Sequence, residues 1–182
     1  MTVAPIHIRI ATETDVSAVA RLMAAEAEEL AVYDPTVELN RGFDWTKLAQ
    51  IQIRKSRSHL TLAESPEGVV GLMQTLLVGT GSNRSMSHLP QRILRGLFRR
   101  AAGKERDLVH QSCHGRIEHV FVLPGHRRLH PAVLLYRDAL RWLRLERADF
   151  VEGVVHERNQ VIKSLAARSG FEPVRVMMRR SV

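Results

Sequence analysis

The stretch that most constrains this chain is residues 116–139, which predicts a strand, a tight turn and a helix in direct succession. Residues 116–122 alternate two sets of side chains and are rich in β-branched and aromatic types, as a strand requires. Pro124 and Gly125 end that strand, because proline cannot donate to a β-ladder and glycine favours turns. Pro131 then suits the first turn of a helix, where its missing N–H leaves no hydrogen bond unmade.

The turn between this predicted strand and helix is basic. Arg127 and Arg128 lie shortly before Pro131. The first N–H groups of a helix have no acceptor within the helix, and the helix dipole adds partial positive charge. Two arginines beside such donors indicate a site for phosphate. The alternative is an ordinary strand–helix connection with two solvated arginines.

The turn resembles motif A of the GNAT superfamily, whose members are acyl-CoA-dependent N-acetyltransferases. In that family a Val-x-Pro turn precedes Arg/Gln-x-x-Gly-x-Gly/Ala, and this chain has Val122-x-Pro124 followed by a related segment. That segment is Arg127-Arg128-Leu129-His130-Pro131-Ala132. It keeps the leading Arg and the final small residue, and it has His130 where the family has its middle Gly.

A second motif of the same family lies nearer the C-terminus. Asn159 stands where GNAT proteins have an Asn that opens a helix. Gly170-Phe171 stands where that helix ends, before a last strand. The two motifs are in the family's order and at its usual separation, and together they cover roughly the last third of the chain.

The resemblance implies transfer of an acetyl group from acetyl-CoA to a primary amine, by direct attack within a ternary complex. It implies that backbone N–H groups of residues 127–132 hold CoA, and that a backbone N–H at Phe121 or Val122 polarises the thioester carbonyl. Asn159 is expected to bond the pantetheine arm, and its alternative role is a helix N-cap. If the position of His130 requires a positive φ, its Cβ costs about 1–2 kcal/mol.

Glu118 is the candidate general base. It lies four residues before Val122, on the strand where several GNAT enzymes carry a Glu or His. A half-buried carboxylate can have a raised pKa and can accept a proton directly or through water. The alternative is a structural Glu paired with Arg116 or another arginine. His119 points to the opposite face if the strand is regular.

The general acid of the family has no counterpart at the expected position. Many GNAT enzymes carry a Tyr five residues before the motif Phe, and this chain has Ala166 there. Tyr136 and Ser164 are candidate substitutes, although neither matches the motif. Water is a further alternative, because a thiolate is a fair leaving group.

The order of predicted elements is β-α-α-β-β-β-α-β-α-β. Strands are expected near residues 6–10, 59–64, 69–78, 116–122, 149–155 and 174–179, and helices near 16–33, 45–57, 131–145 and 159–169. Gly71 is expected to mark a bulge or a close approach within its strand. This order predicts a GNAT-like α/β fold, a central mixed sheet with helices on both faces, in one domain over residues 1–182.

Composition limits the setting of this domain. No run approaches the roughly 18 apolar residues that a membrane span needs, and the N-terminus lacks the layout of a signal peptide. The single cysteine, Cys113, excludes an internal disulfide and fits a cytoplasmic protein. No His or Cys spacing predicts a metal site. The net charge of +8 favours anionic partners such as a phosphorylated cofactor or nucleic acid.

A basic insertion at about residues 79–112 departs from the family, which joins these strands briefly. It contains a basic amphipathic segment that suits nucleic acid, an anionic membrane or an acidic partner, and otherwise a surface helix with solvated arginines. The alternatives to a small-molecule or protein acetyltransferase are therefore a GNAT-fold binding module with a decayed cofactor loop and an enzyme acting on an RNA-borne amine. A homodimer is compatible with the resemblance, because GNAT proteins often dimerise through their last strands.

Overall fold

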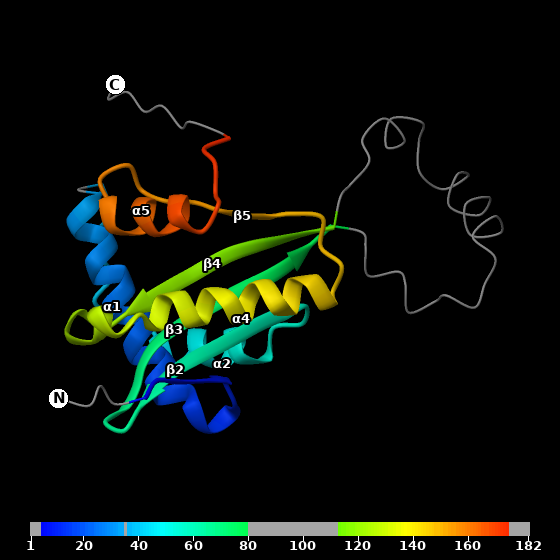
Figure 1. Cartoon of the computed structure of the whole chain (residues 1–182). Helices are drawn as coiled ribbons and strands as arrows, with labels where there is room; N and C mark the ends of the chain where they lie inside the picture. Colours follow the sequence, from blue (N-terminus) through cyan, green and yellow to red (C-terminus); the bar gives the residue numbers. More distant parts are fainter. Residues whose placement is uncertain (1–4, 35, 80–112, 175–182) are drawn as a thin grey trace, which may run out of the picture.

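The computed structural model describes residues 5–34, 36–79 and 113–174 (Figure 1). Its elements, in chain order, are β1 (His7–Ile10), the 3₁₀-helix η1 (Glu13–Asp15), α1 (Val16–Tyr33), α2 (Trp45–Arg54), β2 (Ser58–Ser65), β3 (Gly68–Val78), β4 (His114–Val122), the 3₁₀-helix η4 (Pro124–Leu129), α4 (Pro131–Leu145), β5 (Val151–Gly153) and α5 (Gln160–Arg168). The strands form one sheet in the order β1-β2-β3-β4-β5. Neighbours are antiparallel except β4 and β5, which are parallel, so the predicted mixed α/β sheet is confirmed.

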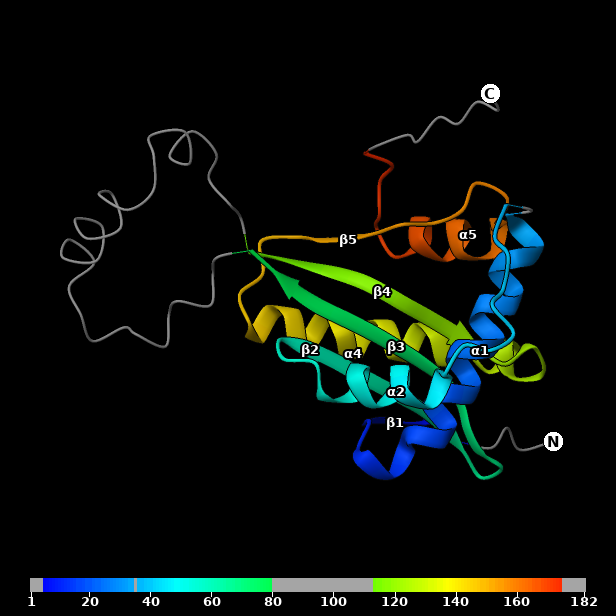
Figure 2. The same cartoon turned by 180° about the vertical axis from the view of Figure 1, so that it is seen from behind.

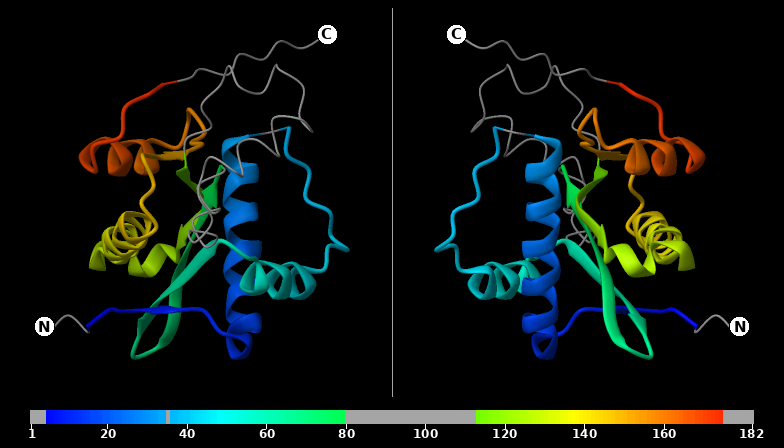
Figure 3. Two further views of the ribbon diagram at one scale, coloured as in Figure 1. Left: turned by 90° about the vertical axis from the view of Figure 1, so that its right-hand side faces the viewer. Right: turned by 90° about the vertical axis from the view of Figure 1, so that its left-hand side faces the viewer.

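Helices cover both faces of the sheet, as Figure 3 shows in side view. Adjacent residues of a strand point to opposite faces, so Leu72 joins the core under α1 and α2 while Met73 joins the core under α4. Phe121 and Val122 divide between the two cores in the same way. In Figure 2, α2 lies in front of the sheet and α4 lies behind it. The two cores therefore fix which side chains of β4 face each helix layer.

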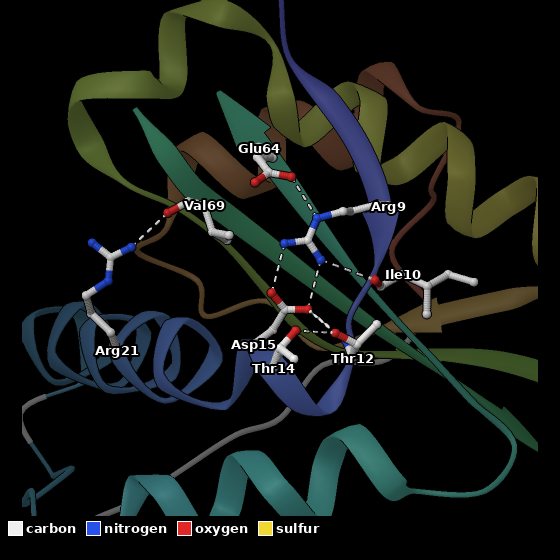
Figure 4. Close-up of polar contacts among 8 residues, drawn as sticks. All are labelled: Arg9, Ile10, Thr12, Thr14, Asp15, Arg21, Glu64 and Val69. Carbon is white, nitrogen blue, oxygen red and sulfur yellow. Dashed lines mark hydrogen bonds and ion pairs between the residues drawn. The ribbon is translucent and has the colours of Figure 1, made fainter. Parts of the chain in front are cut away.

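The first helix begins at a polar network that also binds the edge of the sheet (Figure 4). Arg9 on β1 donates to both carboxylate oxygens of Asp15 at 2.8 Å and to Glu64 on β2 at 2.7 Å. The backbone N–H and the hydroxyl of Thr12 both donate to Asp15. Hydrogen bonds from Arg9 and Thr12 hold the pKa of the Asp15 carboxyl well below its usual range. The network thus fixes the start of α1 against β1 and β2.

Gly71 lies at both features that its sequence context predicts. The pairing of β2 and β3 shifts register between Ala63 and Glu64, opposite this glycine. A Cβ on Gly71 would lie 3.0 Å from the carbonyl oxygen of Phe121 and 3.0 Å from Cγ2 of Val122. A side chain at Gly71 would therefore press against β4 at this close approach.

Several boundaries differ from the prediction. Helix α2 ends at Arg54 instead of about residue 57, because Arg57 has a left-handed φ of 57° and β2 begins directly after it. Strand β5 is shorter than the predicted 149–155, with only Val151–Gly153 paired. The expected last strand at 174–179, apart from Val174, and residues 80–112 of the basic insertion lie outside the described residues.

Helix α5 has the ends that its sequence predicts. The side chain of Asn159 accepts a hydrogen bond from the N–H of Ile162 at 3.1 Å, which makes it the N-cap. Gly170 has a φ of 84° and its N–H donates to Ala167, while Phe171 N–H donates to Ala166. This pair of bonds is a Schellman motif. Within the described part of the chain, no helix is long and apolar enough to cross a membrane.

Candidate functional site

The parallel strands β4 and β5 separate after a short paired segment. Their pairing runs from Gly115–Val151 to Ile117–Gly153, while β4 continues to Val122. The N–H of Leu123 donates to Val70 on β3, so strand alternation directs the N–H of Val122 to the other side of β4. We call the side of residues 118–122 that β5 leaves uncovered the open edge. It presents backbone donors to whatever lies between the two strands.

A bulge in β4 places two polar side chains on one face. Gln74 of β3 is paired with His119 and Thr75 with Ile117, so Glu118 is the extra residue. Glu118 contacts Lys55, which follows α2, and His119 contacts Glu26 of α1. Both side chains therefore lie on the α1–α2 face. The expectation that His119 points away from Glu118 assumed a regular strand, and the bulge removes that regularity.

Glu118, the predicted general base, forms an ion pair. Its Oε2 lies 2.9 Å from Nζ of Lys55, and its side chain is 28% exposed. The predicted structural alternative was a pair with Arg116 or another arginine, whereas the partner is a lysine and Arg116 lies 3.0 Å from Glu152. The Glu118 carboxylate is therefore held by a side chain that follows α2. The catalytic role of Glu118 stays a prediction.

Glu26 of α1 contacts the open edge at two points. Its Oε2 lies 2.7 Å from Nδ1 of His119, and its Oε1 accepts a hydrogen bond from the N–H of Val120 at 3.0 Å. Sequence reasoning missed this residue. The available signal was its position, because Glu26 follows Met23 by three residues and Leu22 by four, and so interrupts the apolar face of α1.

The predicted phosphate-binding turn forms the 3₁₀-helix η4 and the start of α4. The element η4 ends with Arg127, Arg128 and Leu129. His130 follows it with a φ of 60° and a ψ of 26°. The position therefore has the left-handed backbone that favours glycine, the residue that the family motif carries there. The His130 side chain is exposed, and its carbonyl accepts hydrogen bonds from Val133 and Leu134.

The first turn of α4 suits an anion. Pro131 is its first residue, Ala132 its second, and neither η4 nor α4 has an acidic residue in its first turn. The carbonyl of His130 is the first acceptor of the helix, which leaves the N–H of Ala132 without an acceptor inside α4. This donor and the positive end of the helix dipole fit a phosphate group.

Arg127 forms contacts within the protein. Its Nε donates to the carbonyl of Val122 at 2.9 Å, its terminal nitrogen pairs with Glu29 of α1, and its guanidinium lies 5.6 Å from the ring centre of Phe121. Glu29 therefore neutralises the charge of Arg127 at the predicted phosphate-binding turn. Arg127 therefore connects α1 to the end of β4 and to η4.

The remaining predicted residues have structural contacts. Asn159 caps α5 through its side chain, and its expected contact with a pantetheine arm stays a prediction. Tyr136 is a buried residue of α4 and packs edge-on against Phe171, with ring centres 5.4 Å apart. Burial raises the pKa of its hydroxyl, which suits a core residue better than a general acid. Ser164 is exposed on α5. Within the described residues, no group of three potential metal ligands gathers.

The architecture defines a class of proteins with a mixed sheet, helices on both faces and two parallel strands that separate beside a helix N-terminus. No protein-family model and no curated protein matches the chain, but solved structures match over almost its whole length. A tetramutant of the BH1408 protein from Bacillus halodurans is 17% identical, with 97% of this chain and 99% of that chain covered and a TM-score of 0.74.

Two matching structures carry the names of acetyltransferases. The ribosomal-protein-alanine N-acetyltransferase from Brucella melitensis biovar Abortus 2308 is 12% identical, with 98% and 100% of the two chains covered and a TM-score of 0.65. AAC(6′)-Iy in complex with the bisubstrate analogue CoA-S-monomethyl-acetylneamine is 14% identical, with 98% and 99% covered and a TM-score of 0.63. The chain therefore has the fold of the GNAT acetyltransferases, which confirms the fold that the two motifs predict.

Proposed function

We propose that the protein is a GNAT-type N-acetyltransferase that transfers an acetyl group from acetyl-CoA to an amine. The observation that carries this proposal is the open edge of β4, which leads directly into the left-handed residue His130 and the start of α4. The likeness in fold to acetyltransferases, one of them solved with a CoA-containing analogue, supports it. On this proposal one domain over residues 1–182 carries the activity.

The residues of the chain divide the work of the reaction. Acetyl-CoA supplies an activated acetyl group on a thioester. The N–H of Ala132 and the dipole of α4 bind its phosphates, and Val122 directs its N–H to the thioester carbonyl oxygen. Two side chains on the α1–α2 face of β4, Glu118 and His119, lie where an amine that approaches this edge can lose a proton.

Substitutions at His130 test the cofactor site, because Asn and Asp have the same shape and both tolerate a left-handed backbone. Both also cap a helix well, so His130→Asn and His130→Asp are expected to fold alike. We expect wild type and His130→Asn to bind acetyl-CoA with a dissociation constant between about 1 μM and 1 mM. The added negative charge in His130→Asp is expected to weaken binding by at least about fivefold.

Isothermal titration calorimetry with purified protein measures these affinities, and thermal unfolding of each variant verifies the fold. Equal affinities of the Asn and Asp variants would contradict phosphate binding at this turn. An absence of heat with wild type at millimolar acetyl-CoA would contradict the enzyme proposal and favour a binding module with a GNAT fold. The acceptor amine, RNA binding by residues 79–112 and a homodimer stay predictions.

A further inference from the structure

His119 has the surroundings of an oriented base. Its Nδ1 lies 2.7 Å from Oε2 of Glu26, and its side chain is 26% exposed. The other oxygen of Glu26 accepts the N–H of Val120, so the carboxylate is held by the backbone of the same strand. The imidazole is thereby fixed beside the open edge of β4 by a residue from a different element, α1.

We propose that Glu26 orients His119 as the proton acceptor of the acetyl transfer, an inference that rests on the proposed function. A carboxylate is an acceptor, so the ring nitrogen that faces it carries the proton. Nδ1 therefore donates to Glu26, and Nε2 keeps its lone pair for the amine. In this assignment His119 is the catalytic residue and Glu26 is a positioning residue.

The proton balance of the step is simple. The amine nitrogen attacks the thioester carbonyl carbon, a C–N bond forms and the C–S bond breaks. The proton of the amine passes to Nε2 of His119, and the leaving thiolate takes a proton from water. The imidazolium that forms keeps its hydrogen bond from Nδ1 to Oε2 of Glu26, which lie 2.7 Å apart.

The neighbouring charges favour His119 over Glu118. The Glu118 carboxylate is already paired with the ammonium group of Lys55, which lies 2.9 Å away. Glu26 is already hydrogen-bonded through both oxygens. Another charged residue on this part of α1 is Glu29. Its carboxylate pairs with the guanidinium of Arg127. Among these described groups, Nε2 of His119 is the nitrogen with a free lone pair.

Three variants separate the possible bases. His119→Ala removes the base, Glu118→Gln removes the competing carboxylate, and Glu26→Gln keeps the size of the positioning residue. In Glu26→Gln the amide oxygen can still accept the N–H of Val120, while the amide NH₂ donates to Nδ1 of His119. The ring proton then moves to Nε2, which can no longer accept a proton.

The assay measures thiol release from acetyl-CoA in the presence of spermidine, kanamycin and a peptide with an N-terminal alanine. We expect His119→Ala to lower kcat by at least about 100-fold and Glu26→Gln by at least about tenfold, and each of them to lower it more than Glu118→Gln does. Added imidazole is expected to restore part of the rate to His119→Ala. The fall in rate at acid pH, where imidazolium has no lone pair, is expected to disappear in that variant.

Two measurements distinguish failure of this inference from failure of the proposed function. If calorimetry shows that wild type does not bind acetyl-CoA, the proposed function itself fails. If wild type binds and turns over, a fully active His119→Ala or an inactive Glu118→Gln overturns the assignment of the base. Nitrogen NMR gives a readout without turnover, because the proposal requires the Nδ1–H tautomer of His119 in wild type and Nε2–H in Glu26→Gln. The Nε2–H tautomer in wild type would overturn it.

Discussion

His130 illustrates how one residue can depart from a motif and still keep its geometry. The motif that this turn resembles has glycine at this position, and His130 adopts the left-handed conformation that glycine tolerates best, with a φ of 60°. The left-handed conformation costs a residue with a Cβ about 1 kcal/mol of backbone strain. The side chain of His130 is exposed. The substitution therefore leaves the entrance to α4 in place.

At the same scale, Asp15 is expected to make the stability of the protein depend on acid pH. Its pKa is depressed in the folded protein by Arg9 and Thr12, so its contribution is present above the unfolded pKa of about 4 and is lost as the pH falls below it. We expect Asp15→Asn to lower the free energy of unfolding by about 2 kcal/mol at pH 7. The difference from wild type is expected to shrink towards pH 2.

Urea unfolding across this pH range measures the effect of Asp15→Asn. Glu13→Gln is the matched control, because Glu13 forms a similar pair with Arg54 on the surface, with side chains 57% and 68% exposed. Surface pairs contribute little, so this control is expected to leave stability unchanged. A constant difference between Asp15→Asn and wild type from pH 7 to pH 2 would contradict the assignment.

At the scale of elements, the packing of α4 on β4 depends on one glycine. A Cβ on Gly115 would lie 2.5 Å from Cδ1 and 2.6 Å from Cδ2 of the buried Leu143. Gly115 also begins the pairing with β5, where it faces Val151. This contact places α4 against the part of β4 that precedes the separation of the two strands.

Gly115→Ala is expected to destabilise the protein by about 1–3 kcal/mol, because the added methyl group overlaps Leu143. Leu143→Ala leaves a cavity that costs about 2–4 kcal/mol. The double variant is expected to lose less than the sum, since the new methyl enters that cavity. Denaturant unfolding of all three measures the coupling. Gly125→Ala is the control, because a Cβ there has no atom within 4 Å, and additive losses would contradict the overlap.

At the scale of the whole molecule, α1 links the helix layer to the candidate site. Glu26 reaches β4, and Glu29 pairs with Arg127 of η4. Figure 1 shows the C-terminal half of α1 beside the end of β4. The geometry of the predicted phosphate-binding turn therefore depends on a residue almost a hundred positions earlier in the chain.

This arrangement predicts that Arg127 acts through the shape of its guanidinium and not through its charge alone. Arg127→Lys keeps the positive charge but cannot contact both Val122 and Glu29 as a planar fork does. We expect it to weaken acetyl-CoA binding by about fivefold, which corresponds to roughly 1 kcal/mol, and Arg127→Ala to weaken it to a similar degree. Calorimetry with Glu29→Gln as a third variant tests this. Wild-type affinity in Arg127→Lys combined with a loss in Arg127→Ala would indicate a direct contact with phosphate instead.

Much of the fold could be predicted from local patterns. Runs of strand-forming residues bounded by turn residues located β2, β3 and β4, and capping residues located α5 from Asn159 to Gly170. The candidate site was harder to predict, because its contacts join distant segments. Glu118 and His119 were placed on opposite faces by an alternation that the bulge interrupts. No local sequence pattern indicates that Lys55 and Glu26 contact β4 or that Glu29 contacts η4.

The sequence by itself determined the order of the elements, the alternation that divides the side chains of the sheet between two cores, and the strand–turn–helix at residues 116–139. These features depend on period, proline, glycine and capping, which act over a few residues. Only the tertiary structure decided that Arg127 pairs with Glu29, that Glu118 pairs with Lys55, and that Glu26 holds His119 at the open edge. Such contacts form between segments that packing brings together, and no local rule of the chain specifies them.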